Sequence, residues 1–191
     1  MIAQSKEERI YDACVHINQA RGQRELCKKI MCAAEQDSLT QLPHSETSRC
    51  IVMDYSQNAG IPQFADTQPG RTYYYSPVTV NIFGIVDCSI KGGKLDCFVY
   101  HEGQGGKGGN NVASMLMLYL KRKGWLKNDG PGKQLTVIMD NCASQNKNSM
   151  VLRLANLLVE CNYFEEVNFV FYIVGHTKNC ADRWYVLYLK I

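Results

Sequence analysis

Three aspartates lie where carboxylates can combine to do chemistry. Asp54 and Asp140 each directly follow a short apolar run typical of a buried strand, and Asp182 lies in a helical pattern after a third such run. If the first two runs form neighbouring strands, their ends lie at one edge of the sheet, and the helix can bring Asp182 over that edge. Three carboxylates there would hold one or two Mg²⁺ or Mn²⁺ ions through oxygen ligands. Two such metals can drive cleavage of a phosphodiester.

Each of these aspartates also has an ordinary structural interpretation. An Asp at a strand end often accepts hydrogen bonds from backbone N–H groups and so caps the next turn or helix. That interpretation suits any one of the three positions. It does not explain why all three fall at the same edge of the predicted sheet, so the metal site is the favoured interpretation of the set.

The elements that must position these acids are predicted from residue 49 onward. Runs of β-branched and aromatic residues bounded by turn residues predict strands over 50–53, 78–87, 95–100, 135–139 and 167–174, with a further segment at 73–75. Helical periodicity predicts helices from an N-cap at Asn110 or Asn111 to about Lys123, over 146–162, and around Asp182. A hairpin followed by alternating helices and strands predicts an α/β fold with a mixed five-stranded sheet flanked by helices.

The N-terminal part of the chain is predicted to lie outside this sheet. Residues 5–36 are rich in Glu, Lys, Arg, Gln and Ala and predict one long helix with a weak point at Gly22, so 1–36 forms an N-terminal helical extension. Residues 37–48 contain Ser, Thr and a proline and predict a linker. The core then spans 49–191. Because the sequence stops within the predicted last helix, we expect this core to be truncated at its C-terminus.

The composition argues for a folded intracellular protein. The chain has 191 residues, of which 46% are hydrophobic and 20% charged, and its net charge of +3 gives no strong basic field. No apolar run approaches the ~18 residues of a membrane span, and the N-terminus lacks a signal-peptide core. Nine cysteines without a CxxC pair predict buried thiols in a reducing compartment. A zinc site at Cys14 and His16 is the alternative.

Six segments of the chain resemble, in order, the motifs of an uncharacterised transposase-like domain family. That family belongs to the ribonuclease H-like superfamily of DDE/D transposases and integrases. The resemblance extends over about residues 48–190. The segments are 54–58 (DYSQN), 74–77 (YYSP), 83–87 (FGIVD), 108–114 (GGNNVAS), 140–148 (DNCASQNKN) and 175–183 (GHTKNCADR).

The resemblance implies a ribonuclease H-like fold and an enzyme that cleaves DNA, or cleaves and joins it, with Mg²⁺ or Mn²⁺ bound to Asp54, Asp140 and Asp182. His176 would lie near the metals and orient water or move a proton. DNA is the implied partner, a nuclear location follows from that substrate, and no small-molecule cofactor is implied. The residues implied to contact nucleic acid are Asn141, Gln145, Asn146, Lys178 and Arg183.

These residues have simpler roles as alternatives. His176 suits a structural link between strand and helix, and Lys178 and Arg183 suit a solvated helix start. The three amides of the 140–148 segment suit capping of the helix from residue 146.

Related enzyme classes can be weighed against the residues. Ribonuclease H itself uses a Glu on the first helix of its core, but residues 112–123 contain no acid, so a true ribonuclease H is disfavoured. Proofreading exonucleases need a DxE motif on the first strand, but the chain has Asp54-Tyr55-Ser56 there and lacks the Glu. The glycine-rich stretch 103–109 lacks the GxxxxGK[ST] pattern of a nucleotide loop and is expected to be a mobile loop near DNA. Glu102 is expected to be a turn residue, and Asp87 to lie at the opposite edge of the sheet.

The second function class is a catalytically inactive descendant of a transposase. Such a protein would bind nucleic acid or a protein partner without cutting. Self-association through the N-terminal helix stays open, although its short apolar stripe shows no sustained heptad.

Overall fold

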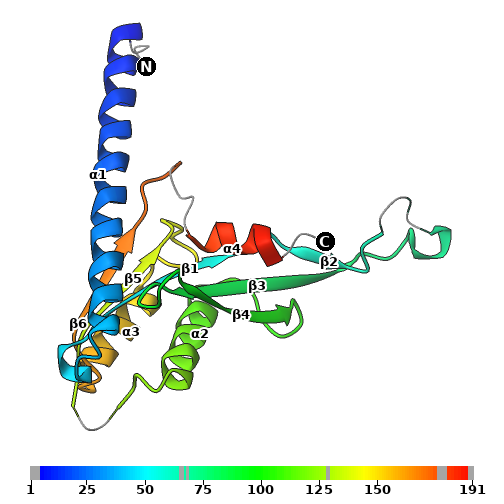
Figure 1. Ribbon diagram of the computed structural model, residues 1–191. Coiled ribbons are helices and arrows are strands. Elements are labelled where there is room, and N and C mark those ends of the chain that lie inside the picture. Colours follow the sequence, from blue (N-terminus) through cyan, green and yellow to red (C-terminus); the bar gives the residue numbers. More distant parts are fainter. Residues whose placement is uncertain (1–4, 65–66, 68, 128–129, 176–179, 189–191) are drawn as a thin grey trace.

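The chain folds into a mixed sheet with helices on both faces (Figure 1). The computed structural model describes residues 5–64, 67, 69–127, 130–175 and 180–188. Its strands are β1 (Ser48–Tyr55), β2 (Ala59–Ile61), β3 (Val78–Asp87), β4 (Lys94–His101), β5 (Gly132–Met139) and β6 (Phe164–Phe171). Its α-helices are α1 (Lys6–Leu39), α2 (Gly109–Arg122), α3 (Ser149–Glu160) and α4 (Cys180–Tyr188), and short 3₁₀ turns lie at His44–Glu46 and Gly70–Thr72.

The sheet is built around β1. On one side β1 pairs with β5 and β5 with β6, all parallel; on the other side β1 pairs antiparallel with β3, and β3 with β4. The short strand β2 pairs with residues 78–80 of β3, just beyond the residues of β3 that pair with β1. It therefore continues the ladder of β1 along the same edge of β3.

The predicted mixed α/β sheet is confirmed, but the number of strands was wrong. Across the described residues the sheet has six strands and not five. The missed strand is β2, whose three residues are too few to stand out in the sequence. The strand predicted at 73–75 is also wrong. Tyr73, Tyr74 and Tyr75 are 70%, 89% and 74% exposed and follow a 3₁₀ turn.

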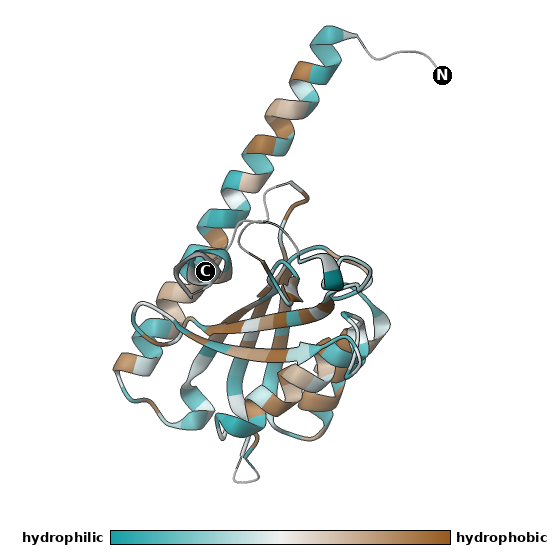
Figure 2. Ribbon diagram, turned by 90° about the vertical axis from the view of Figure 1, so that its right-hand side faces the viewer, coloured by the Kyte–Doolittle hydropathy of each residue, from teal (hydrophilic) through white to brown (hydrophobic). Residues whose placement is uncertain are grey.

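Alternation along the strands divides the core into two layers. Ile51, Met53 and their counterparts on β3 and β5 pack against α2 and α3, and Cys50 and Val52 pack against α1 and α4. The helices accordingly cover opposite faces of the sheet (Figure 1), and the strands between them are coloured mainly as hydrophobic in Figure 2. The side chains of β1 therefore point alternately toward α2 and α3 and toward α1 and α4.

Helix α1 packs on the sheet from about Ala20 to its C-terminal end. Small side chains at Ala20, Cys27 and Ala34 are buried at intervals of seven residues, which lets the helix lie close to the strands. Gln23 fixes it to the end of β6, because its amide donates to the carbonyl oxygen of Phe171 (2.5 Å) and accepts from the N–H of Ile173 (2.9 Å). The N-terminal half projects beyond the body (Figures 1 and 2).

The predicted helices are present, with corrected ends. Helix α1 continues to Leu39, into the stretch predicted as a linker. Helix α2 begins at Gly109 with Gly108 as its N-cap, so neither Asn110 nor Asn111 caps it. Helix α3 begins at Ser149 rather than 146, and its cap is Asn148, whose side chain accepts from the N–H groups of Met150 and Val151. In the described ranges, no helix has the length and apolarity that crossing a membrane requires.

Candidate functional site

The parallel pairing of β1 with β5 brings Asp54 and Asp140 to equivalent positions. Val52 lies opposite Ile138, and continuing that register by two residues places Asp54 opposite Asp140. Neighbouring strands lie about 4.8 Å apart. Val52 and Ile138 both belong to the layer that packs against α1 and α4, and alternation gives the two aspartates the same face. The sequence prediction that these acids share one edge of the sheet therefore agrees with the strand register.

Helix α4, which carries Asp182, packs against the end of β1. Tyr185, one turn after Asp182, is buried and donates its hydroxyl to the backbone carbonyl oxygen of Asp54 at 2.6 Å. Burial raises the pKa of the Tyr185 hydroxyl above its ordinary value, and the nearby charges of Asp54 and, more weakly, Asp182 raise it further. The hydrogen bond from Tyr185 to Asp54 fixes α4 over the end of β1.

Gly84 explains how α4 can approach so closely. It pairs with Asp54 across the β1–β3 ladder. A Cβ atom at this position would collide with the hydroxyl of Tyr185 and would lie 2.9 Å from Cδ1 of Leu95. The glycine of the FGIVD segment is thus required by the packing of α4 on the sheet.

Asp140 is held by the loop that follows it. Its Oδ1 accepts from the backbone N–H of Cys142 at 3.3 Å and from the side-chain amide of Asn146. The carbonyl oxygen of Cys142 in turn accepts from the N–H groups of Gln145, Asn146 and Lys147, which closes the loop into a tight turn. These bonds leave Asp140 in a defined orientation at the end of β5, half-buried.

Asn146 lies beneath this site rather than on its surface. Its side chain is 2% exposed, and in the part of the chain that the structure describes its amide oxygen is buried without a hydrogen-bond partner. A buried side chain that donates to Asp140 is placed to orient that carboxylate. The prediction that Asn146 contacts nucleic acid is therefore replaced by a positioning role, whereas Asn141 and Gln145 are half-buried and keep their predicted role as an untested expectation.

Sequence reasoning missed Lys107, which comes from the glycine-rich stretch 103–109. Its ammonium donates to the carbonyl oxygen of Ser56 at 3.1 Å and lies 4.8 Å from the ring centroid of Tyr55. Burial lowers the pKa of Lys107, and the charge of Asp54 acts in the opposite direction. A lone lysine among glycines was the only signal in the sequence, and nothing there indicated that the loop reaches the end of β1.

The glycine-rich stretch also meets the loop after β5. A Cβ atom at Gly109 would lie within 3 Å of the side-chain amide of Asn148, the N-cap of α3. The close approach of these two segments brings the start of α2 beside the loop that holds Asp140.

The remaining predicted residues are placed only in part. His176 and Lys178 lie outside the described residues, so their predicted roles are neither supported nor opposed. Arg183 is exposed on α4, as either of its two interpretations requires. Glu102 is exposed directly after β4, in the turn expected for it.

The carboxylates at this edge fit a hard divalent cation in kind, since Mg²⁺ and Mn²⁺ prefer oxygen ligands. Among the residues described, however, no three His, Cys, Asp or Glu side chains are already close enough together to hold a metal ion. This includes the alternative zinc site, where Cys14 is exposed on the projecting half of α1. Asp54 and Asp140 thus share one edge of the sheet, and the described residues form no closed ligand set there.

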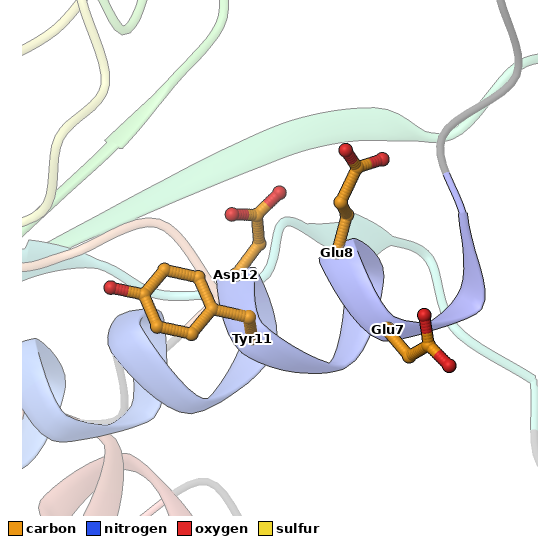
Figure 3. A pocket seen from close by; sticks show the side chains of 4 residues that line it. All are labelled: Glu7, Glu8, Tyr11 and Asp12. Atoms are coloured by element: carbon orange, nitrogen blue, oxygen red, sulfur yellow. The ribbon is translucent and has the colours of Figure 1, made fainter.

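A surface hollow on α1 is separate from this site. Figure 3 shows its lining residues, Glu7, Glu8, Tyr11 and Asp12, on the first turns of the helix. These turns belong to the projecting half of α1, away from the sheet edge (Figure 1). None of the predicted site residues lines the hollow.

Comparison with known proteins gives one family. The family described as Domain of unknown function (DUF7869) matches residues 73–187, which is more than half of the chain. No curated protein and no solved structure matches the chain.

Proposed function

The chain belongs to the family described as Domain of unknown function (DUF7869), and we propose that it is a transposon-derived, metal-dependent enzyme with a ribonuclease H-like fold that cleaves DNA. In this proposal Asp54, Asp140 and Asp182 hold one or two Mg²⁺ or Mn²⁺ ions. Strand transfer is the further reaction that the same site would support, because a 3′ hydroxyl can replace water as the attacking group.

One observation carries the proposal. Parallel register and side-chain alternation give Asp54 and Asp140 the same face at one edge of the sheet, and the bond from Tyr185 to Asp54 packs the helix that carries Asp182 against the end of β1. Acids that only capped local turns would have no reason to converge in this way. The strand order, with β1 between an antiparallel pair and two parallel strands, supports the ribonuclease H-like expectation.

The chain's own residues would divide the work as follows. A bound metal pair would activate the attacking oxygen and stabilise the leaving oxygen of the phosphodiester. Asn146 and the N–H of Cys142 hold Asp140 in place, and Tyr185 holds α4, with Asp182, over β1. His176 is proposed to orient water or move a proton. Contacts to the DNA backbone are proposed for Asn141, Gln145, Lys178 and Arg183.

Nicking of supercoiled plasmid tests this function. Purified chain is incubated with plasmid in Mg²⁺, in Mn²⁺ and in EDTA, and compared with Asp140→Asn. We expect metal-dependent nicking that falls at least about 100-fold in the variant, since even residues that only orient metal ligands cost 10–100-fold.

A matched control separates this effect from a general loss of charge. Glu165→Gln removes one exposed carboxylate from β6 and should nick at the wild-type rate. Equal nicking by wild type and Asp140→Asn would contradict the proposed site. Metal-independent DNA binding without nicking by any form would favour the inactive descendant.

A further inference from the structure

The projecting half of helix α1 carries a short stripe of exposed apolar side chains. Ile10 and Ile17 are 55% and 41% exposed, and Ala13 and Cys14 between them are exposed as well. Because an α-helix has 3.6 residues per turn, these four side chains lie on one face. Within the described helix, buried side chains begin only at Ala20, so this apolar stripe lies beyond the body (Figures 1 and 2).

The fold supports the start of this helix without burying it. Ser5 and Glu8 form a capping box, in which each side chain accepts from the backbone N–H of the other, at 3.2 Å and 2.9 Å. The cap fixes where the helix begins, but it removes no apolar surface from water. A helical segment of about four turns is marginal in water without packing. A partner on the apolar stripe would supply the missing burial.

A charged row flanks the apolar stripe on one side. Glu7, Cys14 and Arg21 follow one another at intervals of seven residues and are all exposed, so they lie along one line of the helix. The row has an acid at one end, a base at the other and Cys14 midway. Antiparallel to a copy of itself, the row places Glu7 opposite Arg21 twice and Cys14 opposite Cys14. In a parallel pair, like charges would face each other at both ends, which is unfavourable.

The apolar stripe has the same symmetry as the charged row. A two-fold axis beside Ala13 and Cys14 places Ile10 opposite Ile17 of the second copy, and Ile17 opposite Ile10 of the second copy. The apolar and charged side chains thus give one axis and one orientation. An unrelated partner would not require this internal match, so a second copy of the chain is the occupant that the pattern favours.

We propose that two copies of this chain associate through the projecting halves of α1, packed antiparallel along the apolar stripe. This contact does not depend on the proposed function. Two helical segments of this length bury less than the ~1,200 Å² of a standard stable interface, so the association is weak and depends on concentration. The points where the two helices meet their own sheets, at Ala20, lie about 20 Å apart along the helix axis. The two bodies therefore lie at opposite ends of the helix pair.

Sedimentation equilibrium of the full chain in reducing buffer tests the association. We expect a reversible dimer with a dissociation constant of about 10–500 µM. Ile17→Glu places a charge in the apolar stripe and should weaken the dimer at least about tenfold. Val15→Glu is the matched control, because Val15 is 36% exposed on the other side of the helix. It should change the dissociation constant less than about twofold.

Charge reversal tests the antiparallel orientation. Glu7→Lys and Arg21→Glu each place like charges opposite one another at both ends of the pair, and each should weaken the dimer about threefold or more. The double variant restores opposite charges and should bind as wild type does. In a parallel dimer Glu7→Lys would only exchange one pair of like charges for another, and the double variant would restore nothing.

Cross-linking tests the position of the axis. Oxidation by copper phenanthroline should link two chains through Cys14, and Cys14→Ser should abolish the linked dimer. Cys32→Ser removes another exposed thiol of α1 and should leave the link intact.

Three results would overturn the proposal. They are a chain that stays monomeric at about 500 µM, a dimer that survives Ile17→Glu, and a double charge variant that dimerises no better than the single ones. Circular dichroism checks that each variant keeps its helix content. If Ile17→Glu does not fold, Ile10→Glu replaces it in the same comparison.

Discussion

Both ends of the β1–β3 ladder carry aspartates, but the burial of these aspartates and their partners differ. At one end, called here the Asp87 end, Asp87 is 3% exposed, its Oδ1 accepts from the N–H of Ser89 at 3.1 Å, and Lys123 lies 3.6 Å from its Oδ2. Lys123 also pairs with Asp96 at 3.1 Å. At the other end, called here the Asp54 end, Asp54, Asp140 and Asp182 are each half-buried.

The difference shows what distinguishes a structural aspartate from a candidate ligand. A carboxylate that is almost fully buried must be matched by cations and donors within the fold. Lys123 and the half-buried Arg49, whose pKa is lowered by burial and raised by the charge of Asp87, supply that match. The half-buried acids of the Asp54 end are partly open to solvent, as the proposed metal site requires. Four predictions separate the two ends.

The largest expected effect is a loss of stability at the Asp87 end. Asp87→Asn leaves Lys123 and Arg49 with less compensation in a buried place, and we expect the free energy of unfolding to fall by about 3 kcal/mol. Urea unfolding measures this change. Mn²⁺ affinity should be the same as in wild type at temperatures where the variant is folded. Loss of Mn²⁺ binding by folded Asp87→Asn would remove the distinction between the two ends.

Gly84→Ala should disturb the Asp54 end through packing alone. The added methyl group would meet the Tyr185 hydroxyl and Leu95, and overpacking of this kind costs about 2 kcal/mol. Because α4 must move, Asp182 moves away from Asp54 and Mn²⁺ binding weakens. Gly22→Ala is the matched control, since a Cβ there meets nothing within 4 Å. In the middle of helix α1 it should stabilise the protein by up to about 1 kcal/mol. Equal stability of the two variants would show that α4 does not pack as described.

Asp140→Asn should have the opposite sign to Asp87→Asn. In metal-free buffer the substitution removes one of the negative charges gathered at the Asp54 end, while the asparagine oxygen can still accept from the N–H of Cys142. We expect the free energy of unfolding to stay equal or to rise by up to about 1 kcal/mol. Thermal unfolding with and without EDTA gives the value. A loss of 2 kcal/mol or more, about the size expected for a buried structural acid, would make Asp140 a structural residue.

The smallest effect appears only at alkaline pH, where each end contributes one buried tyrosine. Burial raises the pKa of Tyr119, with added effects of Asp87 and Asp96, and burial raises that of Tyr185, with added effects of Asp54 and Asp182.

A raised pKa in the folded state means that the unfolded chain ionises first. The stabilisation from each tyrosine is therefore complete below about pH 10, the value of an unfolded tyrosine, and is lost as pH rises from there through the folded pKa. Tyr119→Phe and Tyr185→Phe should each flatten the decline in unfolding free energy above pH 10. An unchanged decline in both variants would contradict the buried, proton-bearing state of these hydroxyls.

The sequence predicted what short-range pattern determines. The apolar runs before Asp54 and Asp140 are strands because continuous burial on both faces requires continuous apolar residues. Their parallel pairing was an assumption of the sequence analysis, and the strand register confirms it. The position of Asp87 at the far end followed from the antiparallel hairpin, and it is confirmed by its pairing with Ile51.

Long-range contacts account for what could not be predicted. Lys107 reaches Ser56 across 51 positions of the chain, and no local pattern encodes that bond. Asn146 was predicted to contact nucleic acid or to cap a helix, whereas its side chain is buried and donates to the half-buried Asp140. The strand β2 was missed because three residues beside a proline carry too little signal, although β3 supplies a partner for them.

A structure of the protein crystallised with Mn²⁺, with anomalous diffraction to locate the metal, is the most direct test of the proposed metal site. We expect an Mn²⁺ ion about 2.1 Å from carboxylate oxygens of Asp54 and Asp140, with Asp182 drawn in by the first turn of α4. Mn²⁺ bound elsewhere, or no Mn²⁺ between Asp54 and Asp140 at saturating concentration, would contradict the claim that these acids form a metal site.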